Sequence, residues 1–459
     1  MAYDLRKIPS QPTRTLTYED YLARDSRPAP ANLLHAGTAA LDTRGLDPRR
    51  YTDRSFYERE RGMWDRVWQM ACREEHLPNV GDHVVYEVGK RSYIVVRASI
   101  TEISAYPNAC LHRGRKLRTE SGRAAEFRCP FHGFTWSLQG DLTHLPCEWD
   151  FPHLNKDDLS LPEVQVDTWA GWVFINPDPA APPLAEYLDP IREHYAPYLW
   201  DQSYMGLHVG KVLHGNWKVI QEAFMESFHS LYTHPQIVGY IDDFGCSYDQ
   251  WEGKPHVNRM MVPFVAASPY VIDQVSEQEV LDDWLGGRAT GSISLDDCAT
   301  ARERMARINR AAAEAATGAN LAEVSDAELV DGWYYNVFPN LMFWGGYGPN
   351  MWYRFRPWKD DHEKTFMEVG YIMRHPKNTP KPAPAKMITL DIDQPWSSVE
   401  ALGSLGGVLD QDTQNMAAVQ EGLNATFAST VPLARYQESR IRHMHNTLDL
   451  YLSGDPTKT

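Results

Sequence analysis

Two short stretches decide the fold of this chain: Cys110-Leu-His-Arg-Gly114 and Cys129-Pro-Phe-His-Gly-Phe-Thr-Trp136. Each carries a cysteine followed closely by a histidine, and the segment between them is long enough for a strand and a turn. They lie in a region, residues 82 to 177, of short aromatic or β-branched runs separated by Gly, Pro and Asn. Such runs are typical of a small all-β domain with loops. The sequence therefore predicts two matched loops, each presenting one thiolate and one imidazole.

Two such loops indicate a metal centre. A zinc finger usually takes two cysteines from one knuckle and two histidines from a helix, and neither loop has that form. A Rieske [2Fe-2S] cluster takes two cysteines on one iron and two histidines on the other, which these loops can supply. The candidate cluster ligands are Cys110, His112, Cys129 and His132. A structural zinc site remains the alternative.

A second group of metal-ligating residues lies in the run NWKVIQEAFMESFHSLYTHP, from Asn216 to Pro235. The run has helical periodicity, and these apolar residues are expected to pack inward: Trp217, Ile220, Phe224 and Phe228. On such a helix Glu226 and His229 share one face at i and i+3, and His234 follows where Pro235 must end the helix. The two histidines can therefore converge on one ion.

Two histidines leave an Fe(II) site one carboxylate short of the 2-His-1-carboxylate triad, whose open positions O2 and substrate need. The segment VLDQDTQNMAAVQEGL offers Asp410 and Asp412. Either aspartate could complete the site.

Both cluster stretches resemble the paired cluster loops of large (alpha) subunits of Rieske non-haem iron aromatic-ring-hydroxylating oxygenases. The resemblance runs from about Tyr51 to Ala428 and includes GWVFIN, FPNLMFW and YRFRPW in this order. It implies an α+β protein, with a small all-β Rieske domain and a larger α+β catalytic domain. The catalytic domain would be of the helix-grip (START-like) type, with an antiparallel sheet.

The resemblance also implies roles for residues. Asp412 matches the position of the family's aspartate ligand and would hold the mononuclear iron with His229 and His234, with Asp410 as the fallback. Glu226 would be the electron-transfer bridge between a cluster histidine of a neighbouring subunit and an iron-ligating histidine.

At two positions the chain departs from many members of the family. Many carry aspartate where this chain has Glu226, which is instead similar to members resembling the carnitine and glycine betaine oxygenases. Ala223 stands where many have asparagine near the iron. These departures put any transfer of substrate class in doubt.

The expected organisation has three parts: an N-terminal extension, residues 1–50; a Rieske domain with a flanking helix, residues 51–178; and a catalytic mononuclear iron domain, residues 179–459. The amphipathic pattern from Ser55 to Cys72 predicts the flanking helix. Residues 239–317 look like an insertion that caps the pocket or forms an interface. Further helices are expected near residues 185–200, 297–316, 396–405, 408–427 and 433–452, and strands near residues 204–214, 333–345, 350–357 and 364–373.

The implied function is that of a terminal oxygenase using O2, Fe(II) and NAD(P)H-derived electrons to hydroxylate or dihydroxylate an apolar, aromatic small molecule. The chain has no flavin or NAD fingerprint, so a separate reductase, directly or via a ferredoxin, would supply electrons to a homotrimer. An oxidative N- or O-demethylase or monooxygenase of the same family is the alternative. A Rieske electron-transfer protein and a zinc-stabilised binding protein are alternatives of another class.

The substrate pocket is expected to be apolar. Aromatic residues expected near the pocket are Phe224, Tyr232, Phe264, Tyr335, Phe338, Phe343 and Trp344.

Composition and charge exclude several other classes of protein. The 459 residues fit two domains, and the formal net charge of -16 disfavours a nucleic-acid partner. No stretch reaches the roughly 20 apolar residues that a membrane helix needs, and the first residues lack an apolar signal core. A cytoplasmic protein without a membrane partner is therefore expected. Six cysteines are too few for a disulfide framework in a chain of this size.

Overall fold

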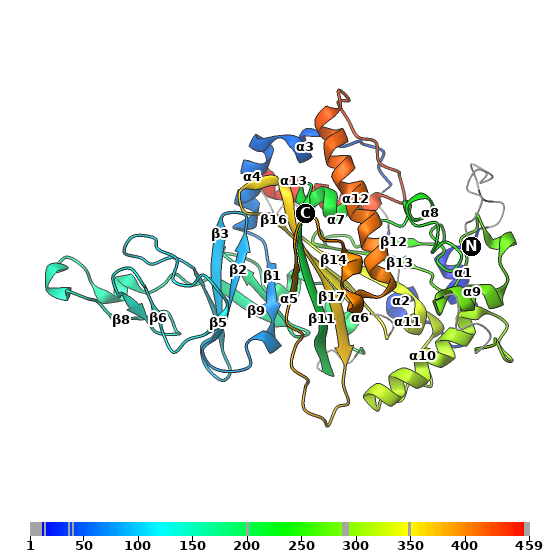
Figure 1. The fold of residues 1–459 in the computed structure, drawn as a ribbon, viewed down its shortest axis with the longest axis horizontal. Coiled ribbons are helices and arrows are strands. Elements are labelled where there is room, and N and C mark those ends of the chain that lie inside the picture. Colours follow the sequence, from blue (N-terminus) through cyan, green and yellow to red (C-terminus); the bar gives the residue numbers. More distant parts are fainter. Residues whose placement is uncertain are drawn as a thin grey trace.

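The computed structural model describes residue 12 and residues 15–34, 37–38, 41–198, 202–286, 293–347 and 350–453. The chain forms a narrow β-rich lobe beside a larger lobe built on an eight-stranded sheet (Figure 1). The fold is mixed α+β, as the sequence predicts. Within the described ranges, no helix is both long enough and apolar enough to cross a membrane.

The narrow lobe contains three small antiparallel sheets, with strand orders β1-β10-β9, β4-β3-β2-β5 and β6-β7-β8. Their strands are β1 (Gln69–Arg73), β2 (Asp82–Val88), β3 (Arg91–Arg97), β4 (Ile103–Pro107), β5 (Gly122–Arg123), β6 (Phe127–Arg128), β7 (Thr135–Trp136), β8 (Leu142–His144), β9 (Gln165–Trp169) and β10 (Trp172–Asn176). Cys110 and Cys129 belong to the apolar core of this lobe, together with Ile94, Phe127 and Trp136.

The helix predicted from Ser55 to Cys72 is too long. Helix α4 (Arg54–Trp64) ends near Asp65, and β1 begins at Gln69 and pairs with β10. All five residues of β1 are buried. The amphipathic stripe correctly marked buried residues, but pairing with a distant strand decided the conformation of their second half.

The larger lobe contains one sheet of order β12-β13-β14-β15-β16-β17-β11-β18. Its strands are β11 (Ser203–His214), β12 (Ser247–Gln250), β13 (Val257–Val262), β14 (Gly332–Val337), β15 (Leu341–Trp344), β16 (Met351–Trp358), β17 (Asp361–Arg374) and β18 (Ile388–Leu390). Neighbours are antiparallel except β11 and β18, which pair in parallel. The expected antiparallel sheet is therefore a mixed one, and the strand expected near residues 333–345 is the hairpin of β14 and β15.

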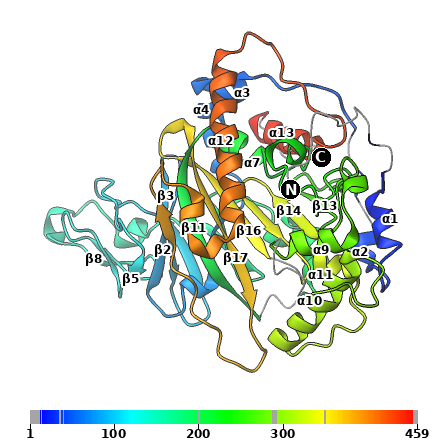
Figure 2. The same ribbon diagram turned by 45° about the vertical axis from the view of Figure 1, so that its right-hand side comes forward.

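Helices α7 (Trp217–Glu222), α12 (Ser404–Ala425) and α13 (Ser439–Leu452) pack near one another beside this sheet (Figure 2). Figure 2 shows, at the end of the larger lobe remote from β8, the helices α1 (Tyr18–Leu22), α2 (Ala31–Leu34), α9 (Glu277–Trp284), α10 (Ala301–Thr317) and α11 (Asp326–Val330). Residues 15–34, here called the N-terminal segment, therefore lie against the described part of residues 239–317, the segment expected to be an insertion.

Three other helix predictions need correction. The helix expected near residues 185–200 is two short helices, α5 (Leu184–Tyr187) and α6 (Ile191–Tyr195), because Pro190 cannot continue the first. Residues 396–402 form two 3-10 turns rather than an α-helix. The terminal helix begins at Ser439 instead of residue 433.

Candidate functional site

The two cysteine–histidine loops have the same backbone geometry. In the first, the N–H of Cys110 donates to the carbonyl of Arg115, and the N–H of Gly114 donates to the carbonyl of Cys110, both at 2.8 Å. In the second, Cys129 donates to Phe134 at 2.8 Å, and Gly133 donates back to Cys129 at 3.0 Å. Gly114 and Gly133 have φ of 71° and 82°, a region that favours glycine. The loops are thus two copies of one turn.

The side chains of these loops fit a metal cluster. The rings of His112 and His132 lie 4.6 Å apart between centroids, and the Nδ1 of His112 is buried without a hydrogen-bond partner. Burial raises the pKa of Cys110, and the adjacent Cys129 thiol adds to this effect. A bound metal would neutralise the charge of two buried thiolates and accept the lone pair of the unpartnered imidazole nitrogen.

Three other residues bring their ligand atoms to one point. His229, His234 and Asp412 place one ligand atom each within 4.8 Å of one another, the only such group among the described residues. The loop residues do not form a single-point group, as expected when ligand pairs hold different irons. A single zinc ion held by all four would instead need a tetrahedral cage.

The sequence predicts one helix that carries Glu226 and His229 and ends near His234, but the structure divides this run. The run from Asn216 breaks after α7 and resumes in α8 (Ser230–Thr233), so Glu226 and His229 lie in the connecting segment. Phe228, expected to pack inward, is 53% exposed. The periodicity continues in the sequence, but the chain turns at residues 223–229.

Asp412 is the common partner of the two histidines. Its Oδ1 lies 2.7 Å from the Nε2 of His234 and 3.5 Å from the Nε2 of His229. The two imidazole rings are 5.2 Å apart between centroids and 72° from parallel. His234 and Asp412 are 2% and 5% exposed, whereas the side chain of His229 is 26% exposed, so His229 is the member of the group that reaches solvent.

The outward nitrogens of both histidines are fixed by neighbouring side chains. The Nδ1 of His229 lies 2.6 Å from Oε1 of Glu226, whose Oε2 accepts a hydrogen bond from the His229 backbone N–H at 3.0 Å. The Nδ1 of His234 lies 2.8 Å from Oε1 of Gln411. When each Nδ1 carries the proton, each Nε2 presents its lone pair to the ion.

The group has a strong preference for positive charge. Burial alone would lower the pKa of His229, but Glu226 and Asp412 outweigh it and raise that pKa to about 10. The pKa of Asp412 is lowered despite its burial, because both histidines donate hydrogen bonds to it. A divalent ion would be stabilised in the same way as these protons.

Asp410, the alternative carboxylate, points to another part of the chain. Its oxygens accept hydrogen bonds from the backbone N–H groups of Trp396 at 2.6 Å and Ser397 at 3.2 Å. Asp412 instead falls on the buried face of α12, in register with Leu409 and Met416. The helical spacing of these residues could have distinguished the two aspartates. Sequence reasoning did not single out Gln411.

An aromatic cavity of about 260 Å³ opens beside His229, His234 and Asp412, which are the predicted iron-site group. Of the aromatic residues expected there, Phe224, Phe264 and Trp344 line it. Tyr335, Phe338 and Phe343 are buried elsewhere, and Tyr232 is 69% exposed. The aromatic residues that sequence reasoning missed are Tyr240, Trp284, Tyr334, Tyr353 and Tyr371.

The charges of the aromatic cavity come from the iron-site group and Glu226, and no Lys or Arg is among its described lining residues. Tyr240, Ile241, Phe264 and Trp284 belong to residues 239–317, so this segment forms part of the wall. The cavity suits a small neutral or cationic molecule better than an anion.

A second hollow, the acidic cleft, reaches the same group and has a volume of about 400 Å³. It shares Ala223, Glu226, His229 and Asp412 with the aromatic cavity. Its other walls are mostly apolar, with Glu222 and Glu438 among them and no Lys or Arg at the described positions. The iron-site group therefore lies between two hollows.

Glu222, in the wall of the acidic cleft, makes the stability of the folded protein depend on pH. Burial raises the pKa of Glu222 to about 8, against the opposing effects of Lys218 and Tyr51. This pKa exceeds that of Glu222 in the unfolded chain, so protonated Glu222 stabilises the folded state. That stabilisation is complete at low pH and is lost as pH rises through about 8. The glutamine in Glu222→Gln is neutral at every pH, so this loss does not occur in the variant. The unfolding temperature of the variant minus that of wild type should therefore rise by about 2 °C or more from mildly acidic to alkaline buffer. Thermal unfolding of the metal-loaded proteins measures this, and a pH-independent difference would contradict the assignment.

Comparison with known proteins extends these observations. Residues 188–454 match the family model of the ring-hydroxylating alpha subunit (catalytic domain), and residues 67–155 match that of the Rieske [2Fe-2S] domain. The chain is 32% identical over 204 residues to the biphenyl 2,3-dioxygenase alpha subunit of Rhodococcus jostii (strain RHA1), covering 43% of this chain and 44% of that protein. It is 23% identical over 316 residues to the glycine betaine monooxygenase oxygenase subunit of Pseudomonas aeruginosa (strain UCBPP-PA14), covering 64% and 69%. The match thus spans less than half the length of the first relative.

Solved structures show the same fold. A quaternary ammonium Rieske monooxygenase superposes with a TM-score of 0.65 at 16% identity, covering 90% of this chain and 96% of the other. Naphthalene 1,2-dioxygenase from a Rhodococcus species superposes with a TM-score of 0.61 at 20% identity, covering 90% and 95%.

Proposed function

Because the chain belongs to the ring-hydroxylating alpha subunit family, we propose that it is the terminal oxygenase of a multicomponent Rieske system. It uses O2 and NAD(P)H-derived electrons to hydroxylate or dihydroxylate a small, apolar, aromatic molecule. The observation that carries the proposal is the convergence of His229, His234 and Asp412 beside an aromatic cavity.

The proposed ligands follow from the two groups. Cys110, His112, Cys129 and His132 would hold the [2Fe-2S] cluster, and His229, His234 and Asp412 the Fe(II). When bound, the cluster supplies single electrons, and the ferrous ion supplies open coordination positions beside the substrate.

The protein's own groups prepare the site. Glu226 and Gln411 fix the orientation of the two imidazoles. The aromatic walls exclude water and hold a flat ring by stacking and edge contacts.

Oxidative N- or O-demethylation or monooxygenation is the second candidate. Tyr and Trp faces with nearby carboxylates, and no Lys or Arg among the described lining residues, also suit a quaternary ammonium group. The glycine betaine relative and the quaternary ammonium structure support this alternative.

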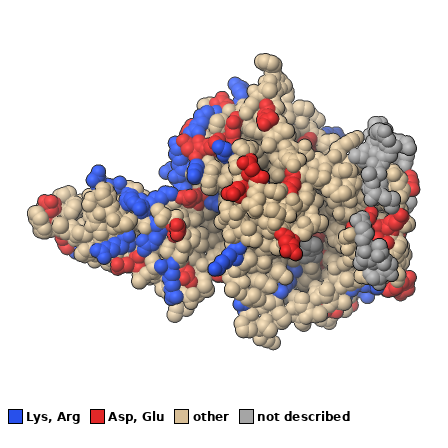
Figure 3. Space-filling model, in the orientation of Figure 1, with Lys and Arg blue, Asp and Glu red and all other residues tan. Residues whose placement is uncertain are grey.

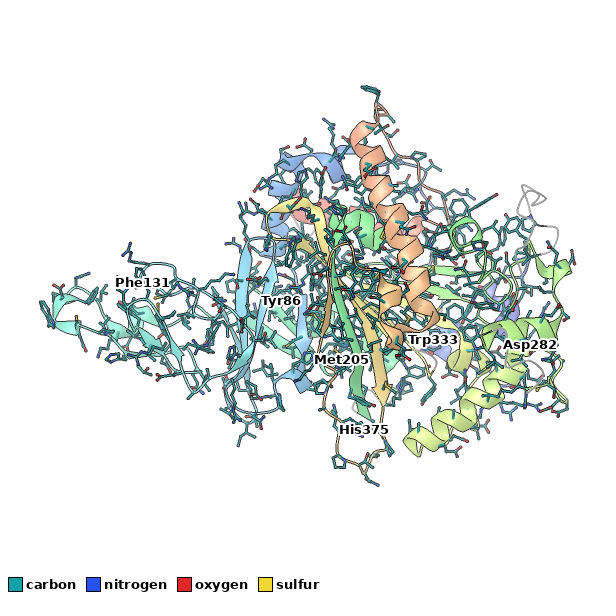
Figure 4. The ribbon with its side chains drawn as sticks, in the orientation of Figure 1. Tyr86, Phe131, Met205, Asp282, Trp333 and His375 are labelled. Carbon is teal, nitrogen blue, oxygen red and sulfur yellow. The ribbon has the colours of Figure 1, made fainter. Side chains whose placement is uncertain are left out.

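We assign the electron route to neighbouring copies of the chain in a head-to-tail homotrimer. The cluster loops lie at the tip of the narrow lobe, where Figure 4 places Phe131, remote from α8 and α12 (Figure 1). The tip exposes Leu111, Phe131 and Arg113, while the acidic cleft is mostly apolar and has Glu226 but no Lys or Arg among its described lining residues. The two surfaces are complementary, which supports docking of one copy's tip near Glu226 of the next.

A separate reductase, directly or via a ferredoxin, would reduce the cluster. Lys and Arg gather on the narrow lobe although the chain is strongly acidic (Figure 3). The basic residues around the cluster loops are Arg113, Arg115, Lys116, Arg118, Arg123 and Arg128. Their charge favours an acidic electron donor.

The test is substrate-dependent O2 consumption with NADH and a surrogate ferredoxin and reductase. A panel of neutral arenes and N-methylated amines is screened with product analysis. Hydroxylated arenes support the first candidate, and formaldehyde release from an N-methyl compound supports the second. Absence of substrate-dependent O2 uptake across the panel, with both metal centres full, would contradict the oxygenase proposal.

A further inference from the structure

Phe264 is a wall of the aromatic cavity that is held under strain. Its ring packs against Trp284 and Trp344, with centroids 5.5 Å and 5.7 Å away. The next residue, Val265, has φ of 56°, a left-handed conformation that a β-branched side chain rarely adopts. Such strain persists only where surrounding contacts over-determine the backbone.

Those contacts come from a buried ion pair. The N–H of Phe264 donates to Oδ1 of Asp331 at 3.1 Å, and its carbonyl accepts from Nη1 of Arg302 at 3.4 Å. Arg302 also donates to both carboxylate oxygens of Asp331. Both backbone polar groups of this wall residue are therefore bound by one arginine–aspartate pair.

The N-terminal segment completes that pair. Oδ1 of Asp25 accepts two hydrogen bonds from Arg302, each 3.2 Å long, and Oδ2 accepts one from the N–H of Ala327 at 2.8 Å. The hydroxyl of Tyr18 donates to Oδ2 of Asp331 at 2.8 Å. The Asp25 side chain is fully buried, and that of Arg302 is 9% exposed.

A second contact from the same segment acts on the neighbouring wall. The hydroxyl of Tyr21 donates to Oδ2 of Asp242 at 2.7 Å, and the N–H of Asp242 donates to the carbonyl of Pro263 at 3.1 Å. Ile241 forms an isolated β-bridge with Phe264, and both line the cavity. Helix α1 thus holds two adjoining wall segments through the buried aspartates Asp331 and Asp242.

We propose that the N-terminal segment is a specificity element of this oxygenase, in which Asp25 is a positioning residue that sets the Phe264 wall through Arg302. The inference rests on the proposed function only where it concerns substrate. Asp25 touches no cavity atom, so its effect should appear in how tightly an arene is held rather than in the chemistry.

The test compares Asp25→Asn and Tyr18→Phe with Asp20→Asn. Asp20 lies on α1 with Tyr18, but it caps the exposed start of that helix by accepting from the Thr17 N–H at 2.8 Å. Removing one partner of a buried ion pair can unfold a protein, so Tyr18→Phe, which loses a single hydroxyl, is the milder variant. Indole is the probe, with kinetics followed by O2 uptake, and amide exchange is measured by mass spectrometry.

The expected result is a rise of about five-fold or more in KM for indole in Asp25→Asn, with kcat within about two-fold of wild type. Amide exchange should accelerate in peptides covering residues 238–242 and 260–266 in both variants. Iron content and exchange in the narrow lobe should not change. In a Phe264→Ala background, Asp25→Asn should add little to KM, because the wall it positions is gone.

Unchanged exchange at residues 260–266 in folded Asp25→Asn and Tyr18→Phe would overturn the positioning role. Full additivity of the Asp25→Asn and Phe264→Ala effects on KM would do the same. If wild type shows no indole-dependent O2 uptake, the arene proposal is at fault, and the exchange data still decide the positioning role.

Discussion

Replacing Glu226 with glutamine is expected to leave both metal centres in place and to lower turnover by about 100-fold. Both carboxylate oxygens of Glu226 accept hydrogen bonds from His229, one from Nδ1 and one from the backbone N–H. A glutamine would oppose one of these donors with its own NH2 group. It would also lose the negative charge and spare lone pairs that could accept an imidazole N–H of a neighbouring chain. Iron content, cluster EPR and turnover are measured on the same preparation.

Glu222→Gln is the matched control for this substitution. Glu222 faces the acidic cleft too, but it bonds to Tyr51 and His445 and has no bond to His229. Near neutral pH its raised pKa keeps it largely protonated, so glutamine imitates its native state. The control should retain turnover. Equal turnover in Glu226→Gln and wild type would show that the bridge assignment is wrong.

Hybrid assemblies test whether the bridge joins different chains. One chain carries Glu226→Gln with an intact cluster, and the other carries His132→Ala with an intact Glu226 and iron site. In a head-to-tail ring, the first chain can reduce the iron of the second, so co-expression should recover activity that neither variant has alone. Failure to recover activity in isolated mixed trimers would contradict transfer between chains.

Asp412→Ala is expected to remove the mononuclear iron, to leave the cluster signal unchanged and to abolish turnover. Iron should fall from about three to about two per chain. The physical reason is that Asp412 supplies the carboxylate that faces both Nε2 atoms, at 2.7 Å and 3.5 Å. Metal analysis and EPR measure the two centres separately.

Asp410→Ala is the control two residues away. This carboxylate caps the backbone at Trp396 and Ser397, so its loss should cost about 1 kcal/mol of stability and no iron. If Asp410→Ala lost the iron and Asp412→Ala kept it, the ligand assignment would have to be reversed.

The sequence predicts the two lobes and the metal-binding residue types because both leave local signals. Each cluster loop is a short turn whose cysteine, histidine and glycine spacing is visible in the chain. Apolar spacing predicts continuous helices for the run from Asn216 and the segment from Ser55, because that spacing reports burial, whereas distant partners decide where a helix ends. Strand β10 is such a partner, because it pairs with β1 just after the end of α4.

Long-range assembly explains what could not be predicted at the site. Trp284 and Tyr353 reach the cavity from segments far in sequence from both His229 and Asp412. Gln411 has no pattern of its own, and only the fold places it against His234. The contacts of Asp25 with Arg302 join residues separated by most of the chain. Such pairings leave no periodic signal in a single sequence.

Metal and sulfide analysis with EPR of the dithionite-reduced protein, purified without oxygen, tests the central claim most directly. The account predicts about three irons and about two inorganic sulfides per chain, with a Rieske-type signal of low average g. Zinc in place of iron, without that signal, would contradict it and leave a metal-stabilised fold without oxygenase chemistry.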